Sequence, residues 1–293
     1  MTIYEITPPG ANRPVPTIGV FDSGFGGLTV LRALIEKIPQ AKFAFLGDTA
    51  RLPYGSKSRR TIARYAAQSA QFLVRNQGAD FLVIACNTAS ALALDAIQDS
   101  VPVPVLGVIE PGAAAARAAS QTGDVLVIAT DATVQSHAYT AACRTHGLRA
   151  LEKACPLLVP LIEEGWTNQT VTAQVLKIYL RELLDDAASK GMKPDTLVLG
   201  CTHYPLVRPL LEHVLLDITG GAGGIRVIDS AEAAAQAAVR HFGARFALPI
   251  PEADAPPPIV RCFATDSVEK FERLGSGFLN RPTGKVELVD LGG

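Results

Sequence analysis

The chain has 293 residues, and its 27 Lys and Arg nearly balance its 28 Asp and Glu, giving a formal net charge of −1. This balance excludes the strongly basic surface of a nucleic-acid-binding protein, and the short basic run at 57–60 is better explained as a solvated turn or helix start. Hydrophobic residues make up 48% of the chain, enough to bury the core of two ordinary domains or one large one.

The N-terminal residues 1–16 are polar and interrupted by prolines, so we expect a flexible extension there rather than a signal peptide. No apolar run is long enough to span a membrane. The five cysteines, at positions 86, 143, 155, 201 and 262, lack the spacing of a disulfide scaffold or a zinc site. These features predict a cytoplasmic protein with free thiols, no bound metal and no membrane partner. A homodimer is compatible with the sequence.

Short apolar runs alternate with amphipathic, alanine-rich segments along the chain, a pattern that predicts α/β architecture with mainly parallel sheets. The expected strands are Thr17–Phe21, Phe43–Leu46, Phe81–Ala85, Val105–Val108, Val125–Ala129, Thr196–Leu199 and Arg226–Ile228. The expected helices are Leu28–Ile38, Thr61–Asn76, Ser90–Gln98, Val171–Ser189 and Ala231–Phe242. Gly220–Gly224 is expected to be a crossover and Pro249–Pro258 a surface linker.

Two segments of the chain resemble each other. Residues 83–88 (VIACNT) and 198–203 (VLGCTH) are both apolar strands that end in Cys, a polar residue and a helix start. Each half also contains a second strand with a polar end, at 22–23 (Asp-Ser) and 130–131 (Thr-Asp). The repetition predicts two pseudo-symmetric α/β units whose strand ends face each other.

Polar clusters follow four of the expected strands, at 22–23, 48–49, 86–88 and 201–203. Because ligands of open α/β sheets bind beyond the carboxyl ends of the strands, these clusters predict a common site. The glycine-rich turn at 22–27 does not fit a dinucleotide-binding fingerprint, since Thr29 stands where a third glycine is needed. It is either an anion cradle at a helix N-terminus or simply a tight turn.

Cys86 and Cys201 each stand at an expected helix N-terminus, where the helix dipole can lower a thiol pKa below its free value of about 8.5. The other cysteines are interpreted as small buried hydrophobic residues. Two thiols across one pocket favour proton transfer at carbon, because inversion needs a base on one face and an acid on the other. Asp22 could modulate Cys86, and His203 could do the same for Cys201.

No cofactor is expected. A pyridoxal enzyme needs a lysine that forms a Schiff base, and Lys42, Lys57 and Lys177 have the character of surface charges. Fixed dipoles and hydrogen bonds would then have to stabilise a developing carbanion.

The motifs together closely resemble the glutamate racemase family, within the aspartate/glutamate racemase group. The matching segments are FDSGFGGLTV (21–30), LPYG (52–55), ACNTAS (85–90), GVIEPG (107–112), VPLIEEG (159–165), LGCTHYPL (199–206) and VIDSA (227–231). They cover most of the chain in the family's order, and the two cysteine motifs are highly specific. One departure is the extension at 1–16.

The resemblance implies a PLP-independent isomerase that supplies D-glutamate for peptidoglycan synthesis. It implies that Cys86 faces the α-proton of D-glutamate and Cys201 that of L-glutamate. Asp22, His203 and Glu163 would assist as catalytic residues, with Glu164 as the alternative to Glu163. The implied substrate contacts are Asp22, Ser23, Tyr54, Gly55, Asn87, Thr88, Thr202 and His203. No arginine lies in a motif, so amides and hydroxyls are expected to hold the substrate carboxylates.

The resemblance also implies two α/β domains with the active site in the cleft between them. Residues 17–110 and 224–293 would form the first domain, completed by the late VIDSA strand, and residues 111–223 the second.

Three alternatives remain open from the residues. A racemase of the same group could act on aspartate or a hydantoin. A hydrolase could use Cys86 as a nucleophile through a covalent acyl intermediate, which gives Cys201 no role. A non-catalytic amino-acid sensor would tolerate alanine at both cysteines.

Overall fold

The computed structural model describes residues 15–221, 224–245 and 257–292. The expected extension, crossover and linker therefore lie wholly or partly outside the described residues. None of the described helices is long and apolar enough to cross a membrane.

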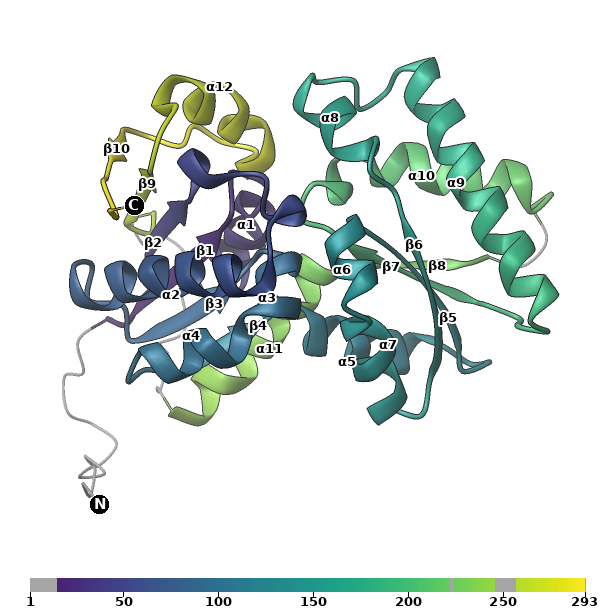
Figure 1. Cartoon of the computed structure of the whole chain (residues 1–293), viewed down its shortest axis with the longest axis horizontal. Coiled ribbons are helices and arrows are strands. Elements are labelled where there is room, and N and C mark those ends of the chain that lie inside the picture. Colours follow the sequence, from purple (N-terminus) through teal and green to yellow (C-terminus); the bar gives the residue numbers. More distant parts are fainter. Residues whose placement is uncertain (1–14, 222–223, 246–256, 293) are drawn as a thin grey trace.

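The strands form two separate parallel sheets, one in each half of the molecule (Figure 1). The first sheet has the order β10-β9-β2-β1-β3-β4. Its strands are β1 (Thr17–Asp22), β2 (Lys42–Gly47), β3 (Phe81–Ile84), β4 (Val105–Gly107), β9 (Val260–Ala264) and β10 (Val286–Leu288). The second sheet has the order β6-β5-β7-β8. Its strands are β5 (Asp124–Ala129), β6 (Arg149–Ala154), β7 (Thr196–Gly200) and β8 (Arg226–Asp229).

The same strand order occurs in both halves. The first four strands of the chain are arranged β2-β1-β3-β4, and the next four repeat this arrangement as β6-β5-β7-β8. Every pairing is parallel. The expected pair of pseudo-symmetric α/β units with parallel sheets is confirmed.

One expected placement is wrong. The VIDSA strand was expected to complete the first domain, but β8 pairs with β7 in the second sheet, with Val227 opposite Leu197. A strand that follows a single crossover helix usually pairs beside the strand before that helix, and β8 thereby becomes the counterpart of β4. The first sheet is completed instead by β9 and β10, neither of which the apolar pattern predicted.

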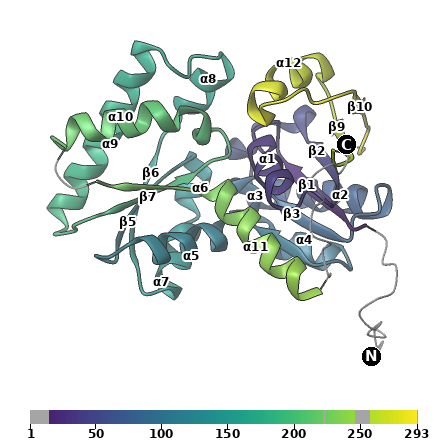
Figure 2. The same cartoon turned by 180° about the vertical axis from the view of Figure 1, so that it is seen from behind.

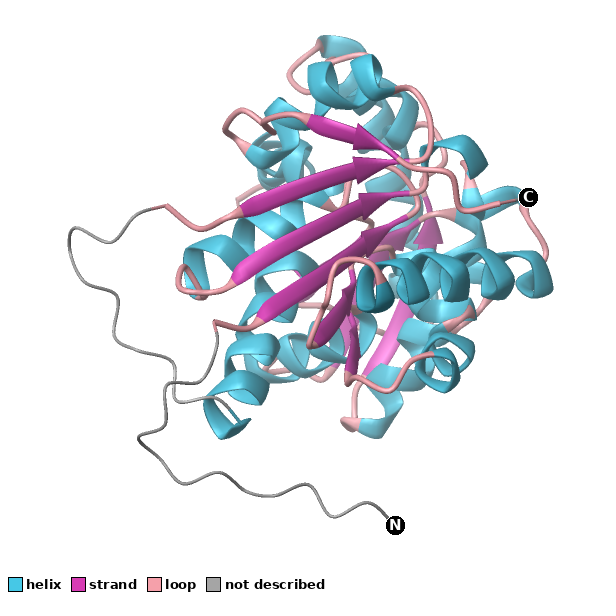
Figure 3. Cartoon of the chain, turned by 90° about the vertical axis from the view of Figure 1, so that its left-hand side faces the viewer, coloured by secondary structure: helices cyan, strands magenta, loops and turns pink. Residues whose placement is uncertain are grey.

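Helices cover both faces of the first sheet (Figure 3). Ile18 and Val20 of β1 pack in one apolar cluster with Leu31 of α1, because side chains alternate along a strand. Phe21 points to the other face, in a cluster with Ile62 of α2. The first-half helices are α1 (Leu28–Lys37), α2 (Arg59–Arg75), α3 (Asn87–Leu92) and α4 (Leu94–Ser100), with short 3-10 turns η1 (Thr49–Arg51) and η2 (Tyr54–Ser56). The single helix expected at 90–98 is therefore two helices, which meet at Ala93.

The remaining helices are α5 (Ile109–Ala119), α6 (Asp131–Gln135), α7 (Ala138–Thr145), α8 (Leu158–Glu163), α9 (Thr170–Ser189), α10 (Arg208–Ile218), α11 (Ser230–Arg245) and α12 (Val268–Leu279), with the turn η3 (Tyr204–Val207). Two of them, α5 and α11, carry the chain between the halves, and α11 packs against both α1 and α5 (Figure 2). The carboxyl ends of β1, β3, β5 and β7 meet where the two halves face each other (Figure 1).

Candidate active site

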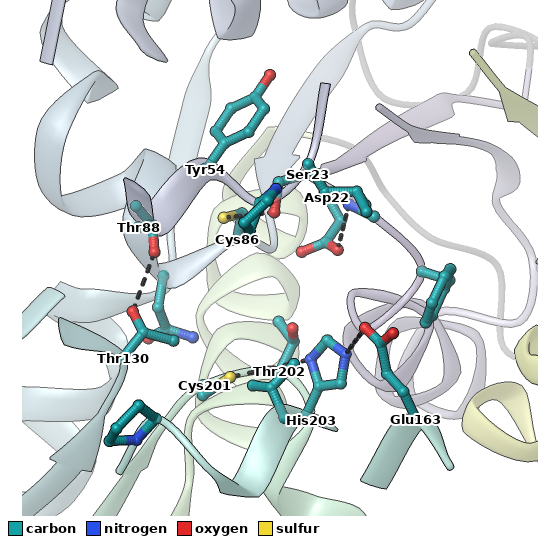
Figure 4. A pocket seen from close by; sticks show the side chains of 18 of the residues that line it. Asp22, Ser23, Tyr54, Cys86, Thr88, Thr130, Glu163, Cys201, Thr202 and His203 are labelled. Carbon is teal, nitrogen blue, oxygen red and sulfur yellow. Dashed lines mark hydrogen bonds and ion pairs between the residues drawn. The ribbon is translucent and has the colours of Figure 1, made fainter. Parts of the chain in front are cut away.

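A cavity of about 380 Å³ lies between the halves, at the carboxyl ends of these strands (Figure 4). All of the residues that the sequence singled out as site residues line it. They are Asp22, Ser23, Tyr54, Gly55, Cys86, Asn87, Thr88, Glu163, Cys201, Thr202 and His203. The sequence thus predicted which side chains the fold brings together, although their roles remain predictions.

The two cysteines reach this cavity from different sheets. Cys86 directly follows the residue after β3, and Cys201 directly follows β7. Both side chains are buried and neither forms a disulfide. Figure 4 shows them on opposite sides of the space that the labelled side chains surround.

Cys86 lies among groups that favour its protonated form. It caps α3, with its Sγ 3.4 Å from the Ala89 amide and 3.3 Å from Ser23 Oγ. Burial raises the pKa of Cys86 to about 12, the charge of Asp22 adds to this rise, and the contacts with Ser23 and Ala89 oppose it. The expected lowering of the pKa of Cys86 is wrong, because burial and the charge of Asp22 outweigh the hydrogen bonds from Ser23 and from the Ala89 amide at the helix start.

Cys201 lies beside an imidazole. Its Sγ is 3.9 Å from His203 Nδ1, and His203 Nε2 is 3.3 Å from Glu163 Oε1. Burial lowers the pKa of His203, but its hydrogen bonds to Cys201 and Glu163 and their charges outweigh this and raise the pKa to about 10. At neutral pH His203 therefore carries a positive charge next to Cys201.

Glu163, and not Glu164, makes this contact. Glu163 is the last residue of α8 and lines the cavity, whereas Glu164 follows the helix and is exposed. Burial raises the pKa of Glu163, but the hydrogen bond and charge of His203, together with Lys270, outweigh burial and lower it. The carboxylate is therefore ionised at neutral pH.

Two buried polar atoms at the cavity lack a hydrogen-bond partner among the described residues. They are Oδ1 of Asp22 and Nδ2 of Asn87. The other atoms of these groups are engaged, since Asp22 Oδ2 accepts from the Gly24 amide at 2.9 Å and Asn87 Oδ1 accepts from Tyr139 at 2.7 Å. Buried polar atoms are nearly always satisfied in folded proteins, so this acceptor and this donor are suited to a ligand that carries both a cation and an anion.

Tyr54 lines the cavity, but its hydroxyl is used elsewhere. It donates to Oδ2 of the buried Asp48 at 2.6 Å, and Thr265 donates to Oδ1 at 3.0 Å. Figure 4 shows the Tyr54 hydroxyl turned away from Cys86. Of the four polar clusters at strand ends, Asp48-Thr49 is therefore the one that does not line the cavity. Asp48 instead accepts the hydrogen bond that positions the Tyr54 ring.

The glycine-rich turn allows the two halves to approach closely. A Cβ added to Gly26 would lie 2.5 Å from His203 Nδ1 and 2.5 Å from Thr202 Oγ1, so only glycine fits there. Thr29, which follows the turn, donates to the Thr202 carbonyl at 3.0 Å. Glycine at position 26 is therefore required by the close approach of the other half.

The family model described as Asp/Glu/Hydantoin racemase matches residues 18–238. The chain belongs to this family. It is 51% identical over 300 residues to the glutamate racemase of Koribacter versatilis (strain Ellin345), a match that covers 96% of this chain and all of that relative. The glutamate racemase of Francisella tularensis, solved in complex with D-glutamate, superposes with a TM-score of 0.80 at 34% identity, covering 94% of this chain and 98% of that one.

The glutamate racemase of Escherichia coli, solved with L-glutamate and the activator UDP-MurNAc-ala, superposes with a TM-score of 0.72 at 29% identity. That match covers 96% of this chain and all of the other. The family membership and the two-domain α/β fold with its interdomain cleft, both expected from the motifs, are confirmed, and the protein is an isomerase.

The cavity of this racemase also has lining residues that the sequence did not single out for the site. They are Gly24, Phe25, Leu52, Pro53, Thr130, Asp131, Pro156, Val159 and Pro160. Thr130 could have been found, because it follows β5 as Ser23 follows β1; it shares hydrogen bonds of 3.2 and 3.0 Å with Thr88 and Thr133. The apolar residues carry no such signal. The described residues that line the cavity include no Arg or Lys.

Proposed function

We propose that this racemase interconverts L-glutamate and D-glutamate without a cofactor, by proton transfer between Cys86 and Cys201. We further propose that it works in the cytoplasm and supplies D-glutamate for peptidoglycan synthesis. The observation that carries the proposal is the pair of buried, free thiols that reach one cavity from two different sheets. The names of its full-length relatives support glutamate as the substrate.

The two thiols exchange one proton each in a turnover. With L-glutamate bound, the Cys201 thiolate takes the α-proton, and the electron pair of the broken C–H bond stays on the substrate. The Cys86 thiol then donates its proton to the opposite face of the same carbon, which gives D-glutamate. Cys201 is left as a thiol and Cys86 as a thiolate, which is the arrangement that D-glutamate requires for the reverse reaction.

The neighbouring groups fit the starting state for L-glutamate. The raised pKa of Cys86 keeps it protonated near neutral pH, as its role as acid requires. The positive His203 lies 3.9 Å from Cys201 Sγ, on the side of the cavity where the proposal places the base.

The unsatisfied polar atoms suit the two ends of an α-amino acid. Asp22 Oδ1 would accept from the α-ammonium group, and Asn87 Nδ2 would donate to the α-carboxylate. We assign the carboxylates to the hydroxyls of Ser23, Thr88 and Thr202 and the backbone amide of Gly55, all residues that line the cavity. In a cavity without Arg or Lys among its described lining residues, such fixed dipoles would also stabilise the carbanion.

The position of His203 is unfavourable for the hydrolase alternative. A hydrolase with Cys86 as nucleophile needs a base beside that thiol. His203 lies against Cys201 instead, while a hydroxyl, an amide and a carboxylate surround Cys86.

The proposal is tested by incubating the purified protein with each glutamate enantiomer in heavy water, without added cofactor. The circular dichroism of glutamate reports the ratio of its enantiomers, and mass spectrometry reports deuterium at the α-carbon. We expect racemisation from either side, with deuterium entering mainly the inverted product. Isotope entering recovered substrate and product alike would indicate a single base. A covalent acyl intermediate, or binding without exchange, would contradict a racemase acting on glutamate.

A further inference from the structure

Helix α12 brings a lysine from the first half of the molecule to the second half. Both Figure 1 and Figure 2 show α12 next to the α8 segment, where the two halves meet. Lys270 Nζ lies 3.2 Å from Oε2 of Glu163, the last residue of α8. Glu163 uses its other oxygen, Oε1, to contact His203. The carboxylate is thus held between a cation from each half.

The same helix also encloses His203. The Phe278 ring of α12 lies 5.1 Å from the imidazole, and Phe25 of the glycine-rich turn lies 6.1 Å from it. Lys270 Nζ lies 5.4 Å from the centroid of the Phe25 ring, so its ammonium group lies over the same aromatic ring. His203 is therefore fixed by residues from both halves, at the point where they meet.

We propose that Lys270 is a positioning residue of the racemase reaction. By pairing with Glu163 across the cleft, it keeps that carboxylate ionised and directed at His203, and thereby keeps the charged imidazole beside Cys201. The inference rests on the proposed two-cysteine mechanism.

The charge of Lys270 should influence the pH dependence of the proposed reaction at Cys201. The titratable groups that face Glu163 are His203 and Lys270, and those that face His203 are Glu163, Cys201 and Asp22. Loss of a cation raises the proton affinity of every acid near it. The effect is moderated by solvent, since the Lys270 side chain is 43% exposed and that of Glu163 is 22% exposed.

A series of charges at position 270 tests this. Lys270→Arg keeps the charge, Lys270→Met keeps an unbranched side chain of similar length without the charge, and Lys270→Glu reverses the charge. The matched control is Lys177→Met, which removes a lysine that pairs with Asp217 between α9 and α10, away from the cavity. The measurement is kcat/KM for glutamate as a function of pH, at low and high salt.

We expect the acid limb of the profile to move upward by about half a pH unit in Lys270→Met and further in Lys270→Glu. At neutral pH kcat/KM should fall about threefold to tenfold in Lys270→Met. Lys270→Arg and Lys177→Met should keep the native profile, and high salt should shrink the differences. If Lys270→Met and Lys177→Met have equal pH profiles, or if the acid limb of Lys270→Arg does not lie at its wild-type pH, Lys270 does not act through its charge.

Hydrogen exchange provides a readout that needs no activity. The amides of α8 should exchange faster in Lys270→Met than in Lys177→Met, because the pairing across the cleft is lost. Native exchange in both variants would overturn the inference. If the wild-type protein fails to racemise glutamate, the proposed function is contradicted. If α8 nevertheless exchanges faster in Lys270→Met than in Lys177→Met, the pairing of Lys270 with Glu163 still holds.

Discussion

The two halves repeat one strand order but surround their thiols with different groups. Cys86 has a hydroxyl, a backbone amide and the carboxylate of Asp22 around it. Cys201 has the imidazole of His203, which Glu163 supports. The repeated topology therefore explains why two thiols face one cavity, and the local side chains explain why their charge environments are opposite.

This difference has a consequence for catalysis. Burial and the charge of Asp22 raise the pKa of Cys86, whereas Cys201 has the positive imidazole of His203 beside it, so the two thiols that we propose as acid and base have unlike neighbours before substrate binds. A symmetric pair of thiols would have to divide its protons by mutual repulsion alone. The asymmetry of the side chains is thus as important to the proposed reaction as the symmetry of the fold.

The most severe test of the comparison removes one thiol at a time. Cys86→Ala and Cys201→Ala should each lower the racemisation rate by about 10³-fold or more, because each half supplies one indispensable proton-transfer group. Circular dichroism of glutamate gives the rate, and thermal unfolding should show that both variants stay folded. The control is Cys143→Ala, which removes a buried thiol in an apolar cluster away from the cavity and should keep kcat/KM. Substantial turnover in either single variant would refute a requirement for both thiols.

A smaller effect is expected when the charge beside Cys86 is removed. After burial, the charge of Asp22 is the largest cause of the raised Cys86 pKa, so Asp22→Asn should lower that pKa. With L-glutamate Cys86 acts as the acid, and activity is lost as pH rises through the pKa of the acid. The basic limb of kcat/KM should therefore move to lower pH, by about one unit, and kcat/KM should fall about 10²-fold.

This shift belongs to the coupled thiol pair and is read as a macroscopic pKa. The control Asp80→Asn changes a carboxylate that bonds the Thr17 amide at the start of β1, far from the strand ends, and should leave the limb in place. An unchanged or upward-shifted basic limb in Asp22→Asn would show that Asp22 does not set the proton state of Cys86.

The sequence predicted the parts of this molecule whose signals are local. β5 and β7 are continuous apolar runs, and the polar residues that follow them lie at the site as the strand-end rule requires. β6 was missed because its residues RALEKA are mostly half-buried and alternate apolar with charged side chains only loosely. β10 has three residues, too few for any period.

Features that depend on contacts between residues far apart in the sequence could not be predicted from local patterns. Nothing in Arg226–Asp229 indicates which sheet edge it joins, and the choice between Glu163 and Glu164 depends on which side of α8 faces the cleft. Lys270 reaches Glu163 only because α12 returns to the cleft from near the end of the chain. The sequence therefore predicted the polar residues at the strand ends, but not the contacts between the two halves.

The smallest expected effect concerns Tyr54, which the sequence placed among the substrate contacts. Its hydroxyl donates to the buried Asp48 and not into the cavity, so Tyr54→Phe should change kcat/KM by less than about threefold. The variant should instead lose about 1–2 kcal/mol of unfolding free energy, because Asp48 loses one of its donors. Denaturant unfolding and steady-state kinetics separate the two effects. The control is Thr265→Val, which removes another donor to Asp48 at a residue that does not line the cavity. It should show a similar loss of unfolding free energy and a similarly small change in kcat/KM. A loss of tenfold or more in kcat/KM for Tyr54→Phe alone would mean that the hydroxyl turns toward the substrate, so that the first half contributes one more polar group to binding.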